Sequence, residues 1–159
     1  MDLANTVIGV VLFFAIALPI YYINNASKKK RKILQNKLIN LFTSKPIKIS
    51  DYDTFGGDSI IGINENEVCF YQERNNQVVS KVINWKEIAR FSVVKEFTKM
   101  GKQSDKKLSR VVLSFDFKDK SKDSDVILFF QVDETNFMIG EELRIATKWE
   151  EKLNQMLKS

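Results

Sequence analysis

The side chains that most often carry out acid–base and nucleophilic chemistry are scarce in this chain of 159 residues. It has no histidine and a single cysteine, Cys69. Histidine is the most common general base in enzymes, and its absence also excludes Ser/His and Cys/His pairs and any histidine-containing zinc site. Cys69 lies between Val68 and Phe70 in a predicted strand, where a half-buried structural thiol is more common than a nucleophile. We therefore predict a non-catalytic protein without a cofactor or a metal site.

Carboxylates are the remaining candidates for catalysis. The pairs Glu141-Glu142 and Glu150-Glu151 are predicted to lie on the solvent side of a helix, where they would be hydrated charges and not a catalytic pair. Residues 56–58, Gly-Gly-Asp, are too few for a phosphate-binding loop and are not followed by Gly-Lys-Ser/Thr, so they predict a turn. An enzyme that uses carboxylates or Cys69 stays open as an alternative.

The excess positive charge of the chain is confined to its first third. Residues 1–50 contain eight basic side chains and one acid, for a net +7, whereas residues 51–159 contain 17 basic and 19 acidic ones, for a net −2. This local patch suits a membrane surface better than a nucleic acid, so no nucleic-acid partner is predicted. Two interpretations stay open, namely a signal that sets membrane orientation and a contact with anionic lipid headgroups. The centre of the patch is Lys28, Lys29, Lys30, Arg31 and Lys32.

An uncharged run of eighteen residues precedes the basic patch. Residues 6–23 would span roughly 27 Å as a helix, close to the ~30 Å of a bilayer core, and predict a transmembrane helix after a short tail of residues 1–5. Because Lys and Arg favour the cytoplasmic side, we expect a single-pass protein in the lipid bilayer, with its N-terminus outside and its C-terminal domain cytoplasmic. The alternative is a cleaved signal peptide that frees a secreted domain, although no basic residue precedes the run.

Helical spacing continues beyond the basic patch. Leu34, Leu38 and their neighbours predict an amphipathic linker helix within residues 24–46. It could lie along the membrane, pack on the domain or extend the preceding helix as a stalk. Residues 47–159 are then enough for one domain with a single core.

The pattern of that domain changes to strands and closes with one helix. Apolar residues alternate with polar ones from 110 to 118, the clearest predicted strand, and a single apolar stripe from Ile139 to Met156 predicts a long amphipathic helix. Short polar connections imply antiparallel pairing. The expected fold class is α+β, a seven-stranded antiparallel barrel capped by the C-terminal helix. The other predicted strands are residues 47–50, 59–63, 68–73, 78–83, 89–98 and 126–132.

This order of elements resembles the pleckstrin-homology-like superfold. Trp149 matches the tryptophan typical of the last helix of that family, and residues 60–71 followed by 83–88 are similar to the bacterial PH-like and GRAM-like pattern. The resemblance implies a module that docks a protein partner or a lipid headgroup. Phosphoinositide-binding members carry a basic signature in the loop between their first two strands. The resemblance places that loop at residues 51–58, which contain three acids and no base, so the signature is missing. Trp85 and Ile88 are expected to pack at a barrel corner.

Together these observations predict a non-catalytic single-pass membrane protein. Its PH-like binding module would be presented at the cytoplasmic face and dock a protein partner or an anionic lipid headgroup. The alternative is a small accessory subunit of a membrane protein complex, assembled through the transmembrane helix.

Overall fold

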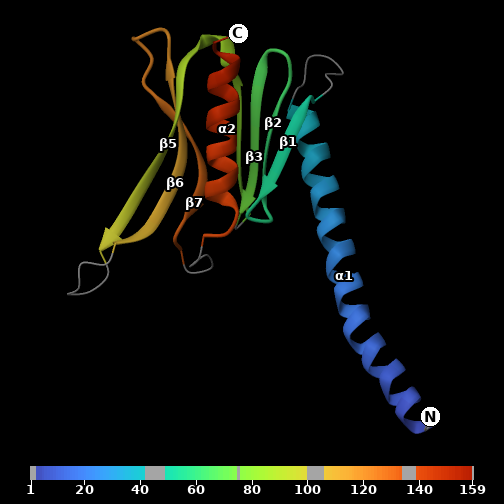
Figure 1. Cartoon of the computed structure of the whole chain (residues 1–159). Coiled ribbons are helices and arrows are strands. Elements are labelled where there is room, and N and C mark those ends of the chain that lie inside the picture. Colours follow the sequence, from blue (N-terminus) through green and yellow to red (C-terminus); the bar gives the residue numbers. More distant parts are fainter. Residues whose placement is uncertain (1–2, 42–48, 75, 100–105, 134–138, 159) are drawn as a thin grey trace.

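A computed structural model describes residues 3–41, 49–74, 76–99, 106–133 and 139–158. The chain begins with one uninterrupted helix, α1 (Leu3–Leu41), of 39 residues. From residue 24 to its end α1 contains no glycine or proline and is rich in Lys and Leu, which favour helix, so nothing stops it at the basic patch. The linker helix is thus a continuation of the apolar segment, and its last turns pack on the domain (Figure 1).

Four antiparallel strands form the first sheet in the order β1-β2-β3-β4. Two of its tight connections contain residues with a left-handed backbone, namely Gly56 and Gly57 between β1 and β2, and Asn76 between β3 and β4. The predicted strand at residues 47–50 is displaced, because the first strand begins at Asp51, and residues 47–48 lie outside the described part. The strands are β1 (Asp51–Phe55), β2 (Ser59–Ile63), β3 (Glu67–Arg74) and β4 (Gln77–Asn84).

Three antiparallel strands form the second sheet in the order β5-β6-β7. A short 3₁₀ turn, η1 (Trp85–Glu87), connects the sheets, and the Asn84 side chain caps it by accepting a hydrogen bond from the Lys86 amide. The strands are β5 (Ile88–Lys99), β6 (Lys106–Phe117) and β7 (Asp125–Gln131).

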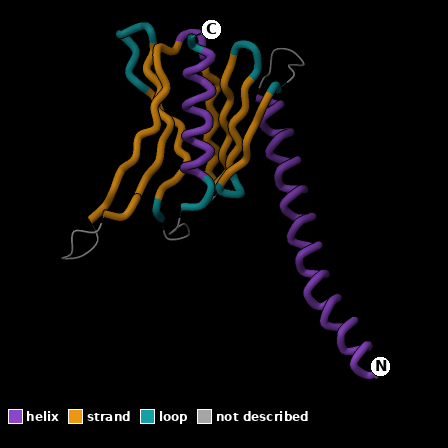
Figure 2. Tube along the Cα trace, in the orientation of Figure 1, coloured by secondary structure: helices purple, strands orange, loops and turns teal. Residues whose placement is uncertain are grey.

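The C-terminal helix α2 (Glu142–Met156) packs against both sheets over the apolar core (Figure 2). Ala146, Trp149 and Leu153 recur at spacings of three and four and are all buried, which places one stripe of the helix in the core. On the opposite side of the first sheet, which we call its outer face, α1 covers β2 and β3 with a second, smaller apolar cluster.

The predicted seven-stranded barrel is wrong. The seven strands belong to two separate sheets, and within the described residues β4 does not pair with β5, nor β1 with β7. One reason is that side chains of α2 occupy the outer edge of β5. The Asn154 side chain donates to the Phe91 carbonyl and accepts from its amide, at 2.7 and 3.0 Å, and Glu150 accepts from the Val93 amide at 2.9 Å. Because these backbone groups of β5 already have hydrogen-bond partners, they are not available to pair with a neighbouring strand.

The predicted transmembrane helix is also wrong. Among the residues that the structure describes, no helix is long and apolar enough to cross a membrane. The single-pass topology that depended on this helix, with an outside N-terminus and a cytoplasmic domain, is contradicted with it.

Candidate functional site on helix α1

The last turns of α1 are fixed to the outer face of the first sheet. Leu34 is nearly buried and Leu38 is fully buried, against Ile60 on β2 and Cys69 on β3. Gly62 on β2 makes this approach possible, because a Cβ atom at that position would lie 2.6 Å from Leu38 Cδ2. The Leu38 side chain therefore packs directly against the backbone of Gly62.

An ion pair beside this contact ties α1 to β3. The Lys37 ammonium pairs with the Glu73 carboxylate, which also accepts a 3.0 Å hydrogen bond from the Tyr71 hydroxyl. The same ammonium lies 5.3 Å from the centre of the Tyr71 ring. The hydrogen bonds from Lys37 and Tyr71 hold the pKa of Glu73 below its ordinary value, and those with Glu73 and Tyr71 raise the pKa of Lys37.

The other half of α1 extends away from the domain (Figure 1). Within residues 12–22, which we call the apolar arm, every large apolar side chain is at least half exposed, up to 67% for Phe13 and 72% for Tyr22. The exposed set consists of Leu12, Phe13, Phe14, Ile16, Leu18, Ile20, Tyr21 and Tyr22. Because successive residues of a helix differ by about 100° in direction, these side chains surround the helix and do not form one stripe.

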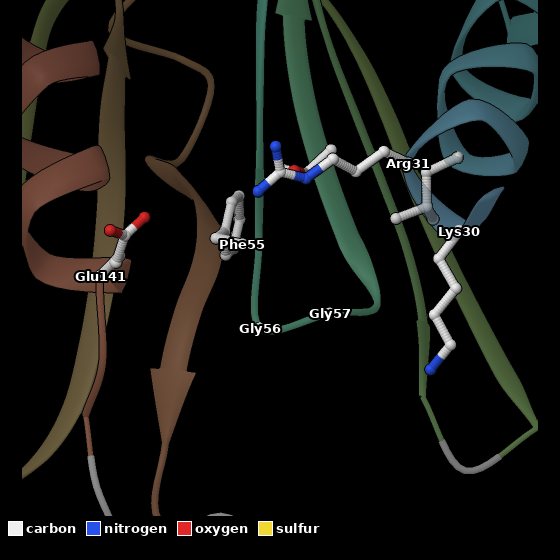
Figure 3. A pocket seen from close by; sticks show the side chains of 8 residues that line it. Lys30, Arg31, Phe55, Gly56, Gly57 and Glu141 are labelled. Carbon is white, nitrogen blue, oxygen red and sulfur yellow. The ribbon is translucent and has the colours of Figure 1, made fainter. Parts of the chain in front are cut away.

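The basic patch lies between the two halves. All five side chains of the patch are exposed. Lys30 and Arg31 also line an open cavity of about 340 Å³ between α1, the β1–β2 turn and the start of α2. Figure 3 shows Arg31 reaching from α1 toward Phe55, with Gly56 and Gly57 below and Glu141 on the far side. The structure does not test the predicted role of the patch at a membrane surface.

Trp85, Ile88 and Trp149, which are predicted to have packing roles, lie in or beside the main core. Trp149 and Ile88 are fully buried in the main core, and the Trp149 indole donates a 2.9 Å hydrogen bond to Asp53. Trp85 is partly buried at the edge of that core, and its indole donates to the Glu65 carbonyl at 3.2 Å. None of the three lies near α1.

Cys69 and one glutamate of each predicted pair are held in packing or hydrogen-bonding contacts within the fold. Cys69 is fully buried beneath α1, and burial, with the nearby charge of Glu67, raises the pKa of its thiol far above the ordinary value. The expectation that both glutamate pairs face solvent is wrong for one member of each. Glu142 is buried and accepts from the Gly140 amide at 2.6 Å, and Glu150 occupies the edge of β5.

The residues that sequence reasoning missed are those whose partners are distant in sequence. Asn154 and Glu150 have nothing in their local pattern that marks them as edge caps of β5. Lys148 and Lys152 pair with Asp53 and Asp51, each at 2.7 Å, and so neutralise the acids of β1 that sequence analysis placed in a loop.

Comparisons with protein-family models, with curated proteins and with solved structures found no match to this chain. The resemblance to the pleckstrin-homology-like superfold therefore stays a prediction.

Proposed function

We propose that this chain is a non-catalytic docking protein. The apolar arm of α1 would bind apolar helices of a protein partner, and the last turns of the same helix would tie that partner to the two-sheet domain. The observation that carries the proposal is the exposure of the whole apolar arm, from Leu12 to Tyr22, while the same helix is buried at Leu34 and Leu38.

Exposed apolar surface of this extent is a marker of an interaction site. Scattered single apolar residues are ordinary on protein surfaces, but here they are nearly consecutive on one helix. A helix that is apolar on all sides is usually covered on all sides. A partner that contacts only one stripe would leave most of the arm exposed, so we expect at least two partner helices around it.

The absence of catalysis is part of this proposal and is supported by the side chains available. The chain has no histidine, and its one thiol is buried with a raised pKa, so neither is available as a base or a nucleophile. Within the described ranges, no three Cys, Asp or Glu side chains come close enough to hold a metal ion.

Site-specific photo-cross-linking in the native cells tests the proposal. A benzoyl-phenylalanine in place of Phe13 should give an adduct with one polypeptide, whereas the same group at the exposed Lys120 should not. Adding the Phe14→Asp substitution should abolish the adduct, because a charge in a desolvated apolar contact is costly.

Three outcomes would contradict the proposal. Equal labelling from positions 13 and 120 would show that the adduct reflects random encounters. Adducts only with a second copy of the chain, or only with lipid, would show that the arm is covered by something other than a different protein.

A further inference from the structure

The outer edge of β4 is a long strand edge that the rest of the described chain leaves open. β4 has eight residues and, within the described part, pairs only with β3, so one side of its backbone faces away from the sheet. In an antiparallel pair every second residue directs its N–H and C=O groups outward. Among the described residues, no backbone or side-chain group bonds to the outward groups of residues 77–83. This edge therefore has unused hydrogen-bonding capacity.

β4 also lacks the features by which edge strands usually avoid pairing. Such strands are short, charged, bulged or interrupted by proline. The β3–β4 ladder keeps a regular register over all eight residues of β4, whereas both ladders of the second sheet contain a register shift. The only charged side chain of β4, Lys81, is already paired with Asp125. The edge of β5, by contrast, is occupied by side chains of α2.

The side chains along this edge add exposed apolar area. Cys69 and Tyr71 of β3 belong to the cluster beneath α1. Their register partners on β4 are Val82 and Ser80, and directly opposite residues share a face, so these side chains also lie on the outer face of the sheet. Val78 follows at the same spacing. Val78 is 58% exposed and Val82 is 48% exposed, so α1 does not cover them.

We propose that a second copy of this chain binds here, with the two β4 strands antiparallel and Ser80 opposite Ser80 of the second copy. The sequence of β4 is complementary to itself in this register. Val78 of each copy lies opposite Val82 of the other, so the four exposed valines pack together on the outer face. Val79 lies opposite Lys81 on the other face, where no like charges meet.

The charge of Lys81 excludes the competing register. A two-fold axis perpendicular to the sheet requires one residue of β4 to lie opposite its own copy. Only Ser80 and Lys81 lie in the middle of the strand, so only these two axes pair nearly all of β4. With Lys81 at the axis, two ammonium groups would face each other, which is destabilising. Ser80 at the axis brings two small neutral side chains together.

The dimer joins the first sheets of both copies into one sheet of eight strands, four from each copy. The α1 helices lie on the same face of this sheet, and the two-fold axis reverses directions in its plane. The two apolar arms therefore leave the dimer in opposite directions, and the dimer does not depend on what binds them. A single strand edge buries little area, in the class below ~1,200 Å² that is typical of transient complexes, so the dimer should be reversible at micromolar concentrations.

Charge substitutions at the exposed Ser80 of the full chain provide the test. Sedimentation velocity over a range of concentrations measures the dissociation constant of the dimer. Ser80→Lys and Ser80→Glu should each raise this constant on the order of tenfold or more, because like charges then face each other at the axis. An equimolar mixture of the two variants should form dimers again, which misfolded chains would not do. Val94→Lys adds a charge to another strand valine, 42% exposed on β5, and should leave the constant unchanged.

Three results would overturn the proposal. A wild-type chain that stays monomeric at millimolar concentration would show that a second copy does not bind the β4 edge. Association that neither Ser80 substitution weakens would place the contact elsewhere, for example in the apolar arm. If both variants are monomeric and their mixture stays monomeric, Ser80 does not face its own copy and the register is wrong.

Discussion

The two halves of α1 have similar backbones and opposite surroundings. Near its C-terminal end the helix buries Leu34 and Leu38 against the outer face of the first sheet, while the apolar arm leaves Phe13 and Tyr22 exposed. The apolar arm is the more hydrophobic of the two and yet is the exposed one, so hydrophobicity alone does not decide which half is buried. The difference is that only the C-terminal half meets a surface of matching shape, with Gly62 opposite a leucine.

This comparison separates stability from binding within one element. The C-terminal half contributes to the stability of the folded chain, because its apolar area is already removed from water. The apolar arm contributes little to folding and retains its apolar area for a partner. Substitutions in the two halves should therefore have different consequences, and the largest effect is expected where the helix is most buried.

Replacing Leu38 by alanine should lower the free energy of unfolding by about 2–5 kcal/mol, the cost of a cavity at a fully buried leucine. Ile39→Ala is the matched control on the next residue, where 42% exposure should limit the loss to about 0.5 kcal/mol. Urea denaturation of the full chain measures both. If α1 detaches without the domain unfolding, the loss appears as faster hydrogen exchange of its amides. Equal losses in the two variants would contradict the described packing.

Gly62→Ala tests the close approach itself. The new methyl group would lie 2.6 Å from Leu38 Cδ2 and 3.4 Å from the Asp51 carbonyl oxygen, so Leu38 must move. We expect a loss of about 1–3 kcal/mol, as for other overpacked sites. The double variant Gly62→Ala/Leu38→Ala should lose less than the sum of the single variants, because the methyl group fills space that Leu38 vacates. Losses that add within about 0.5 kcal/mol would show that the two residues are not coupled.

Acid should weaken the attachment of α1 through Glu73. The folded-state pKa of Glu73 lies below the ordinary value of 4.5, so its contribution is present above pH 4.5 and is lost as pH falls through the lowered pKa. The pair with Lys37 is largely solvent-accessible, and the effect should accordingly be small. Hydrogen exchange of α1 amides between pH 6 and pH 3 measures it, with exchange rates corrected for pH. The Glu73→Gln variant should show a flatter pH dependence; an unchanged slope would assign the acid sensitivity to other carboxylates.

The smallest effect on stability is expected in the apolar arm. Phe13→Ala and Tyr22→Ala remove side chains that are 67% and 72% exposed, so each should change the free energy of unfolding by no more than about 0.5 kcal/mol. The same substitutions should reduce cross-linking to the partner. Loss of stability comparable to that of Leu38→Ala would mean that the arm packs against its own domain, and the comparison between the halves would fail.

Local pattern predicted several elements well. The strand at Ser59–Ile63 has the bounds that the sequence indicated, and the turn at Gly56 and Gly57 is present with positive φ at both glycines. The first strand is predicted at residues 47–50 but runs from Asp51 to Phe55, residues that the family resemblance places in a loop. The acids in this segment are compatible with a strand only because Lys148 and Lys152 neutralise them from α2.

The two failures of fold prediction have a common origin. The prediction of a membrane helix depends on the length of a charge-free run, and the prediction of a barrel depends on the number of strands. Run length and strand number are local quantities. Whether strands close into a barrel depends on their edges, and here Asn154 and Glu150 of α2 occupy the edge of β5.

The sequence by itself determined the chemistry that is available: no histidine, one thiol, and positive charge concentrated before residue 50. It also determined the periodicity of its strands and of α2, since this depends on neighbouring residues alone. Only the tertiary structure decided that Leu38 meets Gly62 and that the middle of α1 and the turn at Gly56 and Gly57 line one cavity. It alone showed which half of α1 stays exposed. Such contacts join segments far apart in the chain, and local pattern carries no information about their distance in space.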